Sequence, residues 1–199
     1  MVSSIHSQVL YMDEIKKGNY SVFVRHVLDQ ISDSFKLGSS DIKLLNDYRD
    51  YLLSIGTDLV RTYCSAMSMT NTEFFKSNDC IGAFENYWRD LFTDVGKDEY
   101  WIRISIFMLR LFSANVGIAT LITMPTDLAL LAILRAKEDG KLSDQLINTL
   151  GKLSILVSAF YAETLIHLLT EDVGVPLSAF MLLAGNFVNE IIKAYDAHQ

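Results

Sequence analysis

The sequence has few cysteines and prolines, and each shortage excludes a class of protein. Its two cysteines, Cys64 and Cys80, lack Cys-x-x-Cys spacing, so they predict neither a disulfide framework nor a zinc site. Two prolines among 199 residues, with 50% hydrophobic and 21% charged residues, indicate a compact helical domain rather than a disordered chain. The N-terminus does not resemble a secretory signal, so we expect a cytoplasmic protein.

The chain also lacks a basic cluster and long uninterrupted apolar runs. Its 17 Lys and Arg residues are dispersed within a net charge of -7, so we expect no nucleic-acid binding. The apolar runs over 118–134, 153–169 and 175–192 each contain polar residues or proline. A spanning helix needs about 20 apolar residues in succession. We therefore expect buried helices and no membrane-spanning segment.

Motifs of catalysis are missing as well. The sequence contains no Gly-rich phosphate loop, no Gly-x-Ser-x-Gly and no His-Glu-x-x-His. The acidic pairs Asp98-Glu99 and Glu138-Asp139 stand at predicted turns and helix starts, where they favour the helix dipole or solvation. Arg103 and Arg110 could bind an anion, but their spacing fits better a solvated edge with local ion pairs. The sequence therefore predicts a protein that is not an enzyme.

Apolar residues recur at three- and four-residue steps along nearly the whole chain, and strand-like alternation is absent. This periodicity predicts an all-α fold. Pro125 is expected to end one helix, so that another begins at Asp127, and Gly56 is expected to bend a long helix. The predicted helices cover residues 20–35, 40–66, a short segment with Phe74 and Phe75, 81–92, 98–113, 127–137, 143–170 and 177–195.

The order of motifs in the middle of the chain resembles that of the sensor globins. Tyr87-Trp88 and Leu91-Phe92 lie on one helix, Arg103 lies on the next, and a Gly117-Ile118 turn follows. The resemblance implies a globin-like helical sandwich with an extra N-terminal and an extra C-terminal helix. It divides the chain into an N-terminal arm and helix (1–39), a globin-like domain (40–170) and a C-terminal helix (171–199).

In that family the haem-ligating histidine stands four residues before the glycine of this turn, and here that position is Ser113. A serine hydroxyl does not replace imidazole as an axial iron ligand. The four histidines are His6, His26, His167 and His198, so no histidine lies nearby in sequence. His167 fits a packed histidine better than an iron ligand. We therefore expect no haem and no other cofactor.

A pocket that has lost its haem is either filled by side chains or occupied by another ligand, and both readings stay open. Some haem-free relatives bind fatty acid at this place, so the resemblance implies a fatty-acid-like ligand as the sharper hypothesis. The residues expected to line the pocket are Ser113, Leu109, Phe112, Tyr63, Trp88, Phe84 and Tyr87.

The function expected from the resemblance is that of a haem-free regulatory or sensory protein. It would bind a hydrophobic small molecule or a separate signalling protein, and it would act as a homodimer through its last two helices, 143–170 and 177–195. One alternative is a haem-based gas sensor or oxygen-binding globin with unusual ligation. Another is a structural assembly domain with a filled core.

Overall fold

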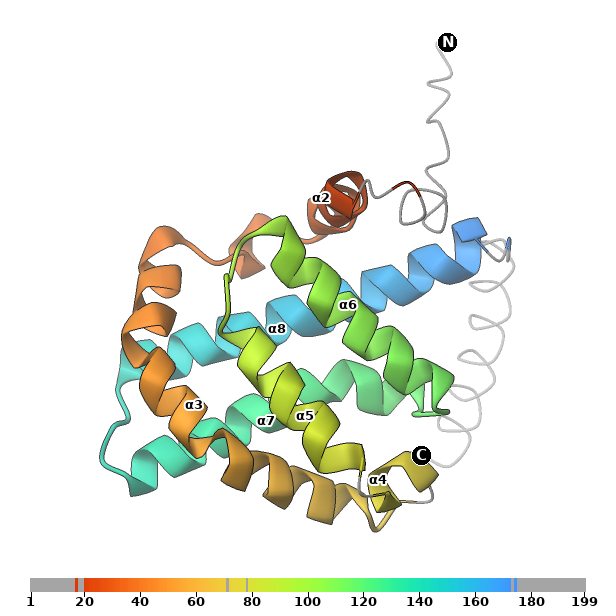
Figure 1. Ribbon diagram of the computed structural model, residues 1–199. Helices are drawn as coiled ribbons and strands as arrows, with labels where there is room; N and C mark the ends of the chain where they lie inside the picture. The colour runs from red at the N-terminus through yellow and green to blue at the C-terminus, as the bar shows by residue number, and fades with distance from the viewer. Residues whose placement is uncertain (1–16, 18–19, 71, 78, 173, 175–199) are drawn as a thin grey trace, which may run out of the picture. The chain divides into compact units, whose positions relative to one another are not determined.

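The computed structural model describes residues 17, 20–70, 72–77, 79–172 and 174. Within these residues the regular structure is helical and no strand occurs, which confirms the predicted all-α fold class (Figure 1). The chain divides into two compact units, residues 20–164 and residues 1–19 with 165–199. The first unit carries the site discussed below. The predicted C-terminal helix over 177–195 lies outside the described residues, as do His6, His198 and nearly all of the predicted N-terminal arm.

The helices follow one another with short connections. In chain order they are α2 (Tyr20–Gln30), a 3₁₀ turn (Asp33–Phe35), α3 (Ser39–Met67), α4 (Glu73–Lys76), α5 (Asp79–Leu91), α6 (Asp98–Ser113), α7 (Ile118–Glu138), α8 (Asp144–His167) and a π-helical turn (Leu168–Asp172).

The boundaries of one predicted helix are confirmed, those of a second are shifted by one or two residues, and the start of a third is wrong. Helix α6 spans the predicted residues 98–113, and α5 begins two residues before the predicted start and ends one residue before the predicted end. Pro125, however, lies inside α7, which already begins at Ile118. A proline removes one backbone donor from a helix. Burial of Leu121, Met124 and Leu128 on the same helix offsets that loss.

The expectation that the cysteines form no disulfide is also wrong. Cys64 near the end of α3 is bonded to Cys80 at the start of α5, with their Cα atoms 6.2 Å apart. The intervening segment doubles back through α4, and this reversal brings together two residues that are 16 positions apart. Disulfides persist mainly in oxidising compartments. The cysteines therefore no longer support the expected cytoplasmic location, which stays a prediction.

Helix α5 packs against α3 on one side and α6 on the other (Figure 1). Its buried residues Phe84, Tyr87, Trp88 and Leu91 recur at helical spacing, so one continuous apolar stripe faces the core. The Trp88 indole lies against Gly56 of α3, and its Nε1 donates a hydrogen bond of 2.8 Å to the Leu52 carbonyl. Gly56 does not end or interrupt α3. Its missing side chain instead lets the two helices approach closely.

The contacts of helix α8 include ring contacts with α2 and α6 and hydrogen bonds to α3. The Phe160 ring lies 6.0 Å from Phe23 of α2 and 4.7 Å from Trp101 of α6, centroid to centroid. Near its start, Thr149 and Lys152 bind Asp41 in the first turn of α3. Residues 144–164 of α8 belong to the unit formed by residues 20–164.

Two helical segments are long and apolar enough to cross a membrane, judged by length and composition alone. They are Ile118–Glu138 and Asp144–Thr170, and 33% and 44% of their most apolar windows are buried inside the protein. Core helices of soluble proteins pass the same test, so this is weak evidence. The expectation that the chain does not span a membrane stays a prediction.

The close approach at Gly56 leads to a prediction about stability. A Cβ atom at Gly56 would lie 2.8 Å from Trp88 Nε1 and closer still to the adjacent ring carbon, so Gly56→Ala forces α3 and α5 apart. We expect the free energy of unfolding in urea to fall by about 1–3 kcal/mol. Gly82→Ala on α5 is the matched control, because no atom lies within 4 Å of a Cβ there. It should be neutral or slightly stabilising. Equal stability of the two variants would contradict the close packing of Trp88 against Gly56.

Candidate functional site

Six aromatic side chains from α3, α4, α5 and α6 are in contact with one another, and we call them the aromatic cluster. The rings of Tyr87 and Phe107 are stacked, with centroids 4.3 Å apart and an interplanar angle of 12°. Phe84 lies between Phe107 at 5.2 Å and Tyr63 at 5.1 Å. Offset-stacked and edge-to-face rings of this kind stabilise a core beyond the area that they bury. The members of the cluster are Tyr63 of α3, Phe74 and Phe75 of α4, Phe84 and Tyr87 of α5, and Phe107 of α6.

The structure brings three of the seven predicted pocket residues together, namely Tyr63, Phe84 and Tyr87. Trp88, the neighbour of Tyr87, turns instead toward Gly56 and the Leu52 carbonyl of α3.

The three predicted pocket residues at the end of α6 lie apart from the cluster's ring contacts. Leu109 is half-buried, whereas Phe112 is 38% exposed and Ser113 is exposed. Ser113 Oγ donates a hydrogen bond of 2.8 Å to the Arg110 carbonyl of its own helix. The residue in the expected iron-ligand position therefore bonds to a backbone carbonyl in the last turn of α6.

Four buried tyrosine hydroxyls, those of Tyr63, Tyr87, Tyr100 and Tyr161, have no hydrogen-bond partner among the described residues. Burial raises the pKa of each phenol, because the charged form would be poorly solvated. The nearby Tyr161 hydroxyl opposes this shift at Tyr87 to a smaller extent, although the two oxygens do not meet the geometry of a hydrogen bond. All four phenols therefore stay neutral at physiological pH.

A cavity of about 380 Å³, partly open to solvent, lies between α5 and α6, next to the aromatic cluster. The stacked pair of Tyr87 and Phe107 forms part of its wall, and of the seven predicted pocket residues Tyr87 lines it. Most of the lining is apolar. The remaining lining residues are Phe74, Ala83, Ile102, Ile106 and Leu111, with the polar or charged Asn86, Asp90, Arg103 and Arg110.

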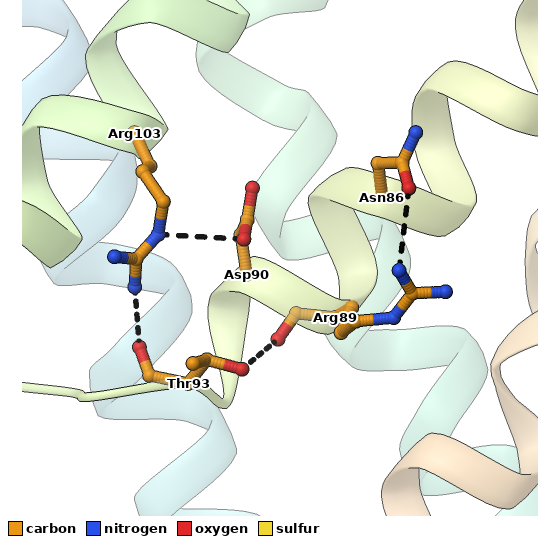
Figure 2. A network of polar contacts seen from close by, with 5 residues as sticks. All are labelled: Asn86, Arg89, Asp90, Thr93 and Arg103. Atoms are coloured by element: carbon orange, nitrogen blue, oxygen red, sulfur yellow. Dashed lines mark hydrogen bonds and ion pairs between the residues drawn. The ribbon is translucent and has the colours of Figure 1, made fainter.

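A network of polar contacts includes Arg103 and Asp90, two of the residues that line this cavity (Figure 2). Arg103 Nε lies 3.3 Å from Asp90 Oδ1, and its Nη2 donates a hydrogen bond of 2.8 Å to the Thr93 carbonyl. Thr93 Oγ1 in turn donates to the Arg89 carbonyl at 2.9 Å, and Arg89 Nη1 reaches Asn86 Oδ1 at 3.5 Å. One arginine of α6 thus holds both the last turn of α5 and the connection that follows it.

Arg110, two helical turns after Arg103, also lines the cavity but is exposed. It forms no ion pair with any side chain in the described part of the chain. The two arginines on one stripe of α6 therefore differ in their surroundings. The charge of Arg103 is neutralised by Asp90, whereas Arg110 is open to solvent.

A second hollow, of about 310 Å³, lies where α3 begins beside α8. Its buried carboxylate, Asp41, accepts hydrogen bonds from Gly38 N at 2.9 Å, Thr149 Oγ1 at 3.1 Å and Lys152 Nζ at 3.0 Å. Burial raises the pKa of Asp41, but these three donors outweigh burial, and the pKa lies below its ordinary value. Because its oxygens are already occupied, Asp41 anchors α8 to α3 rather than offering a binding site.

No group of three or more His, Cys, Asp or Glu side chains that could hold a metal ion occurs within the described ranges. The cavity lining also contains no histidine or cysteine that could ligate haem iron.

The sequence interpretation missed most of the cavity lining. Ile102, Ile106 and Arg110 recur every four residues, which places them on one stripe of α6, and Ala83, Asn86 and Asp90 do the same on α5 at steps of three and four. This spacing is the feature of the sequence that indicates these residues as one lining. The spacing alone assigns Arg103 and Arg110 to a solvated edge and Ile102 and Ile106 to the buried part of α6, because the sequence does not show which stripes of two neighbouring helices face each other.

Comparisons with protein-family models, with curated proteins and with solved structures find no match to this chain.

The hydrogen bonds at Asp41 lead to a prediction about acid stability. Because its folded pKa is depressed, its contribution is present above the ordinary value of 3.8 and is lost as the pH falls through the lower folded value. Asp41→Asn should lower the free energy of unfolding at neutral pH by about 1.5–3 kcal/mol, since charge-assisted hydrogen bonds are lost.

Asp47→Asn provides the control, because it removes the same charge from an exposed position on the same helix. Urea unfolding should show a gap between the two variants at pH 7 that narrows toward pH 2. A gap that is constant over this range would contradict the role of the Asp41 charge.

Proposed function

We propose that this chain is a haem-free, globin-like regulatory protein that binds a hydrophobic, fatty-acid-like small molecule between α5 and α6. The observation that carries the proposal is the cavity of about 380 Å³ with its mainly apolar lining and few polar groups. Small-molecule sites typically have this character and volumes of about 300–1,000 Å³.

The position of the cavity supports the globin-like part of the proposal. It lies between the helix that carries Tyr87-Trp88 and the helix that ends at Ser113. These are the two segments to which the resemblance with sensor globins assigns the walls of the haem pocket. Tyr63 of α3 contributes to the aromatic cluster next to this cavity, as expected of a residue above such a pocket.

The side chains present favour an aliphatic ligand over haem. Helix α6 has no histidine, and Ser113 is engaged with its own backbone. The six rings of the aromatic cluster occupy the space between α3, α4, α5 and α6. The remaining cavity is bounded by Ile102, Ile106 and Leu111, which suit a flexible chain better than a charged macrocycle.

Regulation would require a partner, and the proposal assigns this role to a homodimer or a separate signalling protein. Leu130 and Leu134 on α7 and Ile155 on α8 are large apolar side chains that remain 44–55% exposed. Of these, Ile155 lies on the first of the two helices expected in the dimer interface, 143–170, and supplies apolar surface for an isologous contact between two copies. The second helix expected in the dimer interface, 177–195, lies outside the described residues.

A structural assembly domain is the second candidate, and the aromatic cluster favours it. Stacked and edge-to-face rings at 4.3–6.2 Å are the packing of a filled core. On this reading the space between α5 and α6 is a surface hollow without an occupant.

Ligand binding separates the two candidates. Isothermal titration with decanoate, dodecanoate and 1-decanol should give saturable binding of about one molecule per chain. Ala83→Phe should weaken it at least about tenfold, because the ring would occupy the cavity beside Phe107.

Ala66→Phe is the matched control, because Ala66 is an exposed residue of α3 that does not line the cavity. It should bind all three compounds like the unmodified chain. Absence of binding by the unmodified chain, or equal binding by the Ala83→Phe variant, would favour the filled assembly domain.

A further inference from the structure

The charges around the cavity are unequal at its two ends. The lining contains two arginines and one carboxylate, Asp90. Asp90 lies 3.3 Å from Arg103, so this pair leaves little net charge at its end of the cavity. Arg110 has no acidic partner among the described side chains, so one positive charge remains at the cavity's other end.

Apolar residues separate the two ends. Arg103 and Arg110 are seven residues apart on α6, which corresponds to about 10 Å along the helix axis. Ile106 and Phe107 lie between them in sequence, and both line the cavity. A molecule that lies along α6 therefore meets hydrocarbon for most of its length and a guanidinium at one end.

The charge of Arg103 is already balanced by that of Asp90. Arg103 Nε lies 3.3 Å from Asp90 Oδ1 without the geometry of a hydrogen bond, and Nη2 donates to the Thr93 carbonyl at 2.8 Å. Arg110 is exposed at the rim, and its five N–H donors match the two oxygens of a carboxylate. A carboxylate there would stay partly hydrated while its hydrocarbon chain is buried.

We infer that Arg110 binds the head group of a singly charged amphiphile, a monocarboxylate, whose alkyl chain lies along Ile106 and Phe107 toward the pair of Asp90 and Arg103. A dianionic head group would leave one charge uncompensated, because the lining has one unpaired cation. This inference rests on the proposed function and adds the residue that binds the ligand's head group and the direction in which the ligand lies.

Isothermal titration with decanoate and 1-decanol tests the head-group contact, because both compounds have the same chain length. The unmodified protein should bind decanoate about tenfold more tightly than 1-decanol, since a charge-assisted hydrogen bond adds to the shared burial of the chain. Arg110→Met should lose this preference while its affinity for 1-decanol stays within about twofold.

Arg61→Met is the matched control, because it removes the same charge from an exposed position of α3 that does not line the cavity. It should keep the preference for decanoate. Arg110→Lys should keep a part of it, because the charge remains while the bidentate geometry is lost.

Equal binding of decanoate and 1-decanol by the unmodified protein, or an unchanged preference in Arg110→Met, would overturn the head-group inference and leave the proposed function intact. Loss of preference in Arg61→Met as well would overturn it too, since it would show a general effect of net charge. If neither compound binds the unmodified protein, both the inference and the proposed function are overturned.

Discussion

The contact of Trp88 with Gly56 determines which face of α5 remains for a ligand. A large indole lies where α3 has no side chain, and its Nε1 bonds to the Leu52 carbonyl, so α5 is fixed against α3 along one stripe. Ala83, Asn86 and Asp90 then face α6 and border the cavity. Because residues three and four apart share one face of a helix, the pairing of α5 with α3 determines which residues of α5 face α6.

The two ends of α5 are held by different interactions. At its start, the disulfide from Cys64 to Cys80 ties α5 to the end of α3, and at its other end Arg103 binds Asp90 and the Thr93 carbonyl. Between these points the aromatic cluster fills the interior, while the rows of smaller aliphatic side chains on α6 do not fill the space opposite α5. Dense packing and an adjacent cavity therefore coexist within one pair of helices.

The sequence was sufficient for the helical class, for the boundaries of α6 and for half of the aromatic cluster. Helical periodicity defined α6, and the resemblance brought Tyr63, Phe84 and Tyr87 together. It failed where the outcome depends on contacts between helices. Burial carries α7 through Pro125, and the reversal at α4 joins Cys64 to Cys80. The different surroundings of Arg103 and Arg110 depend on the connection after α5, which no spacing rule describes.

The central claim is that a small hydrophobic molecule occupies the space between α5 and α6. Methyl NMR of the protein titrated with decanoate tests it most directly, because the cavity is lined by the methyl groups of Ala83, Ile102, Ile106 and Leu111. The account predicts saturable shifts that are largest at these four residues and small for the exposed Leu130 and Leu134 of α7. Shifts confined to α7, or no shifts at all, would contradict it.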